Sequence, residues 1–232
     1  VVVGPKADAQ STGEQVATRL SARDRRIRVV PCDRGGDLET ALKRARGRLV
    51  TIVDGGDGLI AGACQSMIQC LERSGSDVVV ARSRSLTPPR APRLAEPLAE
   101  VPEAVEELVA GAVMARRRLW TLPRGLSALR SPVMPLPART LAVLLTATRI
   151  DVLDEEVYTW RAGSAARGPG ADADPGALLA EVDAMVQLVA HAPEAVRQRL
   201  VAERLNRTLA RLAERAHREG PDFVGRLRRT AR

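Results

Sequence analysis

The sequence predicts an α/β fold in which an open, largely parallel sheet carries helices on its faces. Short runs of Val, Leu and Ile alternate along the chain with segments whose apolar residues recur at helical spacing, the order typical of such sheets. Hydrophobic residues make up 45% and charged residues 28% of the 232 positions, which excludes a disordered or fibrous chain. This length is sufficient for one ordinary domain and an appendage.

The first part of the chain alternates regularly between strand and helix patterns. Turn-forming residues at 4–8 separate the first apolar run from a helical pattern that contains Val16 and Leu20. Each later apolar run is again followed or preceded by a helical segment. The predicted strands are 1–3, 27–30, 49–53 and 77–81, and the predicted helices lie around Val16 and Leu20, at 38–46 and at 59–74.

The middle of the chain is interrupted by proline. Five prolines between 87 and 102 predict a surface segment with little regular structure, and a second proline-broken stretch covers 122–137. Between and after these stretches, order is expected to resume. The predicted elements are a helix at 103–118, a helix at 139–148 and an extended segment at 150–153.

The C-terminal part is predicted to be helical and basic. A Gly-rich stretch at 163–176 marks the end of the folded body, and apolar residues then recur at the spacing of one or two amphipathic helices. Residues 197–232 contain eleven arginines against four acidic residues, so they account for most of the net charge of +8. Attraction to an acidic partner or an anionic membrane surface would therefore belong to this tail.

Several classes of protein are disfavoured by the sequence. Cys32, Cys64 and Cys70 have neither CxxC spacing nor a nearby His pair, which argues against a zinc site or a disulfide framework and favours a reduced, cytoplasmic setting. His191 and His217 have no second ligand at suitable spacing, so we expect structural roles for them. No apolar run reaches the 18–20 residues of a membrane span, and no nucleic-acid recognition motif accompanies the arginines.

An acidic turn, Asp54-Gly55-Gly56-Asp57, follows the predicted strand at 49–53. Ligands of open parallel sheets bind beyond the carboxyl ends of the strands. A carboxylate in that position can hold a divalent cation that neutralises a diphosphate. Asp and Gly are also the usual residues of any tight turn. The turn alone therefore does not decide between a ligand site and an ordinary tight turn.

Three segments around this turn, and one farther on, resemble family 2 glycosyltransferases, especially those of bacterial cell-envelope polymer synthesis. The similar segments are 25–30, 45–54, 76–80 and 144–161, and the similarity spans roughly 1–161. It implies a GT-A (Rossmann-like) nucleotide-diphospho-sugar transferase fold at 1–165, with an Arg-rich helical extension at 175–232. In the family a first strand precedes the one near Val1, so we expect the fold to lack that strand here.

The resemblance also implies a site. Asp54 and Asp57 would hold Mn²⁺ or Mg²⁺, and Asp54 and Asp8 would contribute to binding of the nucleotide-diphospho-sugar. Several family residues are replaced in this chain. Gly56 occupies the position of the family's second metal-binding Asp, and Gly4-Pro5-Lys6 occupies that of its Asp-rich turn. Asp37-Leu38-Glu39 replaces the family's Ala-Arg-Asn step. Met134-Pro135-Leu136-Pro137 replaces the Glu-Asp pair that carries the general base. The sequence therefore identifies no catalytic residue.

Two functions stay open at this point. One is a glycosyltransferase that acts on a cell-envelope or secondary-metabolite acceptor, in the cytoplasm or at the inner face of the membrane. The other is a catalytically inactive GT-A-like scaffold or regulatory module, whose residues 197–232 bind a protein partner or an anionic membrane surface. The replaced general base favours the second function, because loss of such proton transfer lowers a rate by about a hundredfold to ten-thousandfold.

Two smaller patterns have more than one interpretation. Tyr158 and Trp160 alternate on the extended segment, where they either pack against a helix or stack on a base or sugar. Arg116, Arg117 and Arg118 close the predicted helix at 103–118, where favourable interaction with the helix dipole is preferred over a phosphate clamp.

Substitution of Asp54→Ala tests the predicted ligand site. If Asp54 holds the cation of a nucleotide complex, the variant loses metal-dependent nucleotide binding, because a neutral methyl group cannot replace a carboxylate ligand. Calorimetric titration of the variant and the wild type with the same nucleotide measures this. Unchanged binding would remove Asp54 from the site.

Overall fold

The computed structural model describes most of the chain, and all structural statements below concern these residues. The chain forms two compact units, residues 1–48 and residues 49–232, and each is considered by itself. The described residues are 2–5, 12–32, 38–53, 57–84, 91–106, 108–121, 135–159, 175–190, 192–205, 208–209 and 212–213.

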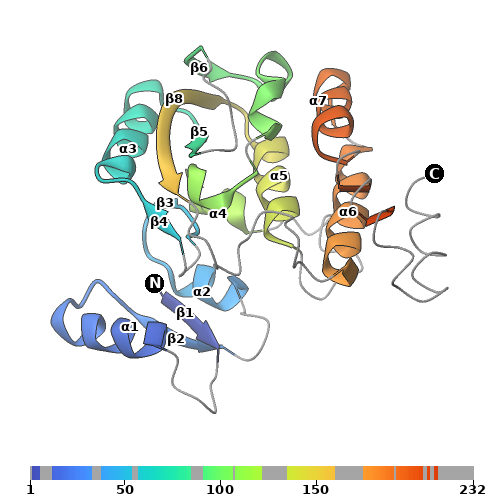
Figure 1. Cartoon of the computed structure of the whole chain (residues 1–232). Helices are drawn as coiled ribbons and strands as arrows, with labels where there is room; N and C mark the ends of the chain where they lie inside the picture. Colours follow the sequence, from blue (N-terminus) through green and yellow to red (C-terminus); the bar gives the residue numbers. More distant parts are fainter. Residues whose placement is uncertain are drawn as a thin grey trace. The chain divides into compact units, whose positions relative to one another are not determined.

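The first unit is a strand–helix–strand–helix arrangement (Figure 1). Strand β1 (Val2–Pro5) pairs in parallel with β2 (Val29–Cys32), and helix α1 (Thr12–Arg23) connects them. Helix α2 (Leu38–Arg44) follows and buries Ala41 and Leu42. The alternation predicted for this part of the sequence is confirmed.

The second unit contains a six-stranded sheet in the order β3-β7-β5-β8-β4, with β6 paired to β8. Only β5 and β8 pair in parallel, whereas the other pairs are antiparallel. The largely parallel sheet expected from the alternation is therefore wrong for this unit, whose sheet is mixed. The strands are β3 (Leu49–Val50), β4 (Gly58–Leu59), β5 (Val78–Ser83), β6 (Arg93–Glu96), β7 (Val113–Arg116) and β8 (Ile150–Thr159).

The mixed sheet arises where the sequence predicted a helix at 103–118. That segment instead forms 3₁₀ turns at Pro102–Glu106 and Ala110–Ala112, then β7, and then the short helix α4 (Arg117–Trp120). Strand β7 lies between β3 and β5, and Val113, Met114 and Ala115 are all buried. Pairing with two neighbours satisfies the backbone of this buried segment and outweighs its local helical spacing.

The central strand β5 has apolar residues on both faces, and helices cover both. Helix α3 (Ala63–Ser74) packs Met67 and Leu71 into one core cluster with Val79 of β5. Helix α5 (Leu136–Thr146) lies on the opposite side of the sheet (Figure 1). Helix α3 ends at Gly75, which adopts a left-handed conformation with φ 70° and donates its N–H to Leu71 O at 3.0 Å.

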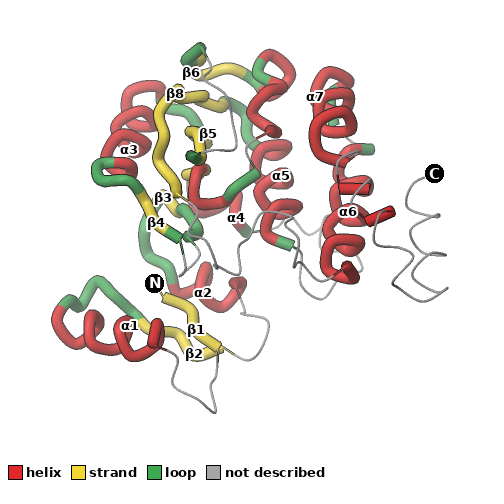
Figure 2. Tube along the Cα trace, viewed as in Figure 1, coloured by secondary structure: helices red, strands yellow, loops and turns green. Residues whose placement is uncertain are grey.

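The C-terminal helices pack against the rest of the second unit. Helix α6 (Pro175–Val189) contacts α5, and α7 (Glu194–Leu200) contacts the 3₁₀ turn Pro102–Glu106, as Figure 2 shows in red. Val196 and Leu200 are buried, and Arg199 forms an ion pair with Glu106. A π-helical turn, Val201–Leu205, follows. Among the described residues, no helix is both long enough and apolar enough for a membrane span.

The close approach of Gly111 to the ring of Tyr158 leads to a stability prediction. A Cβ added at Gly111 would lie 2.0 Å from Tyr158 Cε2, so Gly111→Ala forces the buried ring or the backbone to move. We expect a loss of about 3 kcal/mol in the free energy of unfolding, the upper part of the range for overpacking. Urea denaturation monitored by circular dichroism measures it.

Gly62→Ala is the matched control, because Gly62 has φ +85° but no heavy atom within 4 Å of its added Cβ. Backbone strain alone then destabilises the protein, by about 1 kcal/mol. Equal losses in the two variants would contradict the close contact between Gly111 and Tyr158.

Candidate functional site

Asp57 is the predicted site residue that the structure describes. It directly precedes β4 and is half-buried. Strand β4 runs antiparallel to the end of β8, with Gly58 opposite Thr159 and Leu59 opposite Tyr158. Asp57 therefore lies beside the carboxyl end of β8. Asp54 and Asp8, the other predicted ligands, lie outside the described residues, as does Trp160.

The Asp57 carboxylate accepts a hydrogen bond from the hydroxyl of Tyr158. Tyr158 Oη lies 2.5 Å from Asp57 Oδ2, across 101 positions of sequence. The tyrosine is 2% exposed. A hydroxyl that donates to an ionised carboxylate forms a short and comparatively strong bond, so this contact fixes one oxygen of the predicted ligand.

Three parts of the fold hold Tyr158 in place. Its backbone belongs to β8, where it is aligned with Ser83 of β5, and its carbonyl accepts the Arg84 N–H at 2.8 Å. Its ring lies against the backbone of Gly111 in the turn before β7. The packing interpretation of Tyr158 is thus confirmed for the ring, while the hydroxyl has the polar partner that the sequence alone did not identify.

The acidic run Asp154–Glu156 of β8 is engaged by neighbouring elements. Arg82 Nε lies 3.0 Å from Asp154 Oδ1, and Arg84 Nε donates to Glu156 Oε2 at 3.1 Å. Ser66 of α3 donates its hydroxyl to Glu155 Oε1 at 3.0 Å. These contacts connect β8 to β5 and α3, which explains why the strand continues beyond the predicted end at Leu153.

The described residues provide one carboxylate for a metal ion, not a full set of ligands. Within the described ranges no group of three or more His, Cys, Asp or Glu side chains is placed to hold a metal. Mg²⁺ and Mn²⁺ prefer several oxygen ligands, including waters and substrate phosphates. Asp57 alone does not make such a site.

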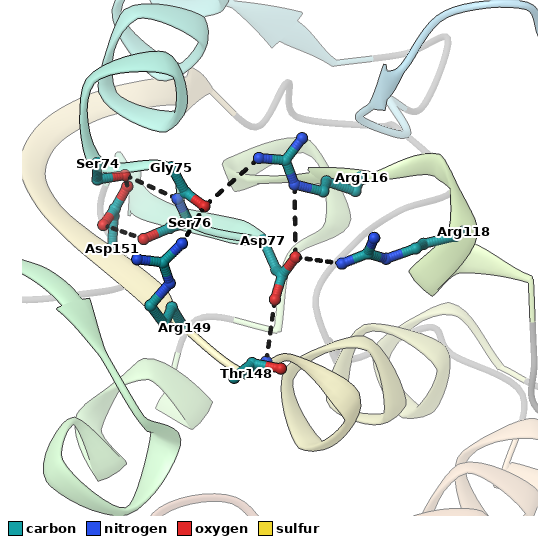
Figure 3. Close-up of polar contacts among 9 residues, drawn as sticks. All are labelled: Ser74, Gly75, Ser76, Asp77, Arg116, Arg118, Thr148, Arg149 and Asp151. Atoms are coloured by element: carbon teal, nitrogen blue, oxygen red, sulfur yellow. Dashed lines mark hydrogen bonds and ion pairs between the residues drawn. The ribbon is translucent and has the colours of Figure 1, made fainter.

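The opposite, amino-terminal ends of β5 and β8 carry a second polar cluster, centred on Asp151 and Asp77, which were not predicted as site residues (Figure 3). Asp151 is fully buried, with an exposed fraction of 0%. Its Oδ2 accepts from Ser74 Oγ at 2.6 Å and its Oδ1 from Ser76 Oγ at 2.8 Å. The backbone N–H of Ala95 also donates to Oδ1, at 2.8 Å. Ala95, which donates this hydrogen bond, has a φ of 57°, a value that is uncommon for residues other than glycine.

Asp77 organises the neighbouring charges at this end. Its Oδ1 lies 2.6 Å from Arg118 Nη2 and 3.4 Å from Arg116 Nε, and its Oδ2 accepts the Thr148 N–H at 3.2 Å. Arg149 donates to the carbonyl of Gly75 at 2.8 Å, as Figure 3 shows. The arginines expected at the end of a helix instead lie at the end of β7 and the start of α4, because that predicted helix is a strand. The signal for this cluster was the polar pattern Ser74-Gly75-Ser76-Asp77 directly before an apolar strand.

Cys70 belongs to the same cluster and is buried. Its Sγ lies 3.3 Å from Asp151 Oδ2, and burial together with the adjacent Asp151 carboxyl raises the pKa of the Cys70 thiol to about 12. Cys64 is exposed, and both are free thiols. A thiol that stays protonated at neutral pH is a poor nucleophile, so Cys70 is not a candidate nucleophile.

Comparison with solved structures identifies the fold. The crystal structure of S. aureus TarS 1-349 in complex with UDP-GlcNAc aligns with a TM-score of 0.67 and 18% identity, over 99% of this chain and 69% of that chain. The UDP complex of the same protein gives 0.63 and 16% identity, over 99% and 70%. No protein-family model matches the sequence, and no curated protein matches it. This chain has the GT-A glycosyltransferase fold, as its sequence predicted.

The Asp151 cluster generates a stability prediction. Asp151→Ala leaves the Ser74 and Ser76 hydroxyls and the Ala95 N–H without their acceptor inside the protein. A buried donor left unsatisfied costs about 1–3 kcal/mol, and we expect a total loss of about 3 kcal/mol in the free energy of unfolding. Urea denaturation measures it.

Glu155→Ala is the control, because Glu155 is an exposed carboxylate on the same strand. Its exposed hydrogen bond from Ser66 is expected to contribute no more than about 1 kcal/mol. A loss for Asp151→Ala as small as that expected for the control would show that the Asp151 cluster does not stabilise the pairing of β5 with β8.

Proposed function

We propose that this chain binds a nucleotide-diphospho-sugar at the carboxyl ends of β5 and β8, as a divergent member of the family 2 glycosyltransferases. The observation that carries the proposal is the place of Asp57, a half-buried carboxylate at that edge of a GT-A fold. Open α/β sheets bind their ligands in this position. The resemblance of segments 25–30, 45–54, 76–80 and 144–161 to that family supports the same assignment.

The proposed roles combine Asp57, which lies at this edge, with Asp54 and Asp8, which the family resemblance implies. Asp57, with Asp54, would hold Mn²⁺ or Mg²⁺ against the diphosphate, and Asp8 would contribute to nucleotide binding. When bound, the cation neutralises the charge that develops on the leaving diphosphate. Tyr158 holds Asp57 through its hydroxyl. The donor that we propose to test first is a UDP-sugar, because the aligned TarS structures contain UDP-GlcNAc and UDP.

One observation favours binding without efficient transfer. The position at which the family carries its general base corresponds here to the start of α5, where Pro135 is the N-cap and the first turn contains no acidic residue. Without a base, the acceptor hydroxyl keeps its proton and attack is slow. A catalytically inactive scaffold or regulatory module, whose residues 197–232 bind a protein partner or an anionic membrane surface, is therefore the second candidate function. A cell-envelope or secondary-metabolite acceptor belongs to the first.

Isothermal titration calorimetry with UDP, CDP and GDP, each with and without Mn²⁺, tests the proposal. We expect saturable binding of one nucleotide that strengthens at least tenfold with Mn²⁺, because the cation bridges the diphosphate and the carboxylates. Absence of binding by a folded sample would overturn the proposal and favour a scaffold that has lost the ligand. Binding that is equally strong with and without Mn²⁺ would remove the metal ion from the proposed site.

A further inference from the structure

We propose that Tyr158 is the positioning residue of the nucleotide site, and that its hydroxyl orients the Asp57 carboxylate toward the diphosphate and its cation. This inference rests on the proposed function. Tyr158 is the only tyrosine in the chain, and its hydroxyl lies 2.5 Å from Asp57 Oδ2.

The hydroxyl is placed rigidly. Tyr158 is held in the ladders that β8 makes with β5 and β4, and its ring is confined by the Gly111 backbone. The side chain is 2% exposed, so exchange of its hydroxyl bond for a bond to bulk water is hindered. The phenol oxygen therefore has a fixed position, and a hydrogen bond from it can fix the position of the Asp57 carboxylate.

Asp57, by contrast, directly precedes a strand of only two residues, Gly58–Leu59. A hydrogen bond to Oδ2 sets the plane of the carboxylate and disfavours the rotamers that turn it away. Carboxylates that bind metal ions are themselves commonly held by hydrogen bonds, and loss of such a partner weakens metal affinity about 10–100-fold. Tyr158 acts through Asp57 and needs no contact with the nucleotide.

The ring and the hydroxyl have separable roles. A phenylalanine fills the same volume against Gly111, so the hydroxyl is not required for packing. A buried hydroxyl does require an acceptor, and the acceptor here is the one described carboxylate of the predicted metal pair. If Tyr158 only filled the core, removal of its hydroxyl oxygen would change the stability of the protein without changing its affinity for the ligand.

The test is calorimetric titration of Tyr158→Phe with UDP and Mn²⁺, or with whichever nucleotide the wild type binds. We expect the dissociation constant to rise about 10–100-fold. Ser76→Ala is the matched control, because it also removes a hydroxyl that donates to a carboxyl, from the opposite end of the same strand pair. It is expected to lower stability while leaving nucleotide affinity within about twofold of wild type.

The outcomes separate this inference from the proposed function. If the wild type binds and Tyr158→Phe binds equally well, the positioning role is wrong while nucleotide binding stands. If the wild type binds no nucleotide, both proposals are overturned. If Tyr158→Phe fails to fold, the single tyrosine of the wild type, labelled with ¹³C at Cζ, is observed by NMR. A shift of its signal on addition of the nucleotide with Mg²⁺ is expected, and an unchanged signal would overturn the role.

Discussion

The parallel pairing of β5 with β8 is the constraint on which the second unit depends. Both strands are central in the sheet, and their apolar residues need cover on two faces, which α3 and α5 provide. Apolar residues fill most of the pair, whereas the acidic run Asp154–Glu156 in the middle of β8 is more exposed and pairs with Arg82 and Arg84. One end holds Asp151 and Asp77, and the other holds Tyr158 beside Asp57.

The two ends differ in what their polar groups can do. At the amino-terminal end, Asp151 is enclosed by donors from α3, from the segment before β5 and from β6, an arrangement that stabilises one register of strands. At the carboxyl end, the Tyr158 hydroxyl holds a carboxylate that is only half-buried. Partial exposure leaves that carboxylate accessible to a ligand, so the same strand pair anchors the core at one end and a candidate binding site at the other.

Local patterns in the sequence predicted elements that are formed by local forces, such as helices α3 and α5 and the alternation in residues 1–48, while the family resemblance implied the GT-A fold class. They failed where pairing with a distant strand decides the conformation. Strand β7 replaces a predicted helix because β3 and β5 satisfy its backbone, and β8 extends through acidic residues because Arg82 and Arg84 neutralise them. Asp57 could be proposed from its turn. The hydroxyl that holds it, 101 residues away, could not.

The central claim is that Tyr158 influences the nucleotide site through Asp57, and a double-mutant cycle tests it most directly. The affinities of the wild type, Tyr158→Phe, Asp57→Ala and the double variant would be measured with the same nucleotide and Mn²⁺. Because the hydroxyl has nothing to orient once the carboxylate is absent, the account predicts that the double variant binds no more weakly than Asp57→Ala. Fully additive losses would show that the two side chains act independently and would contradict it.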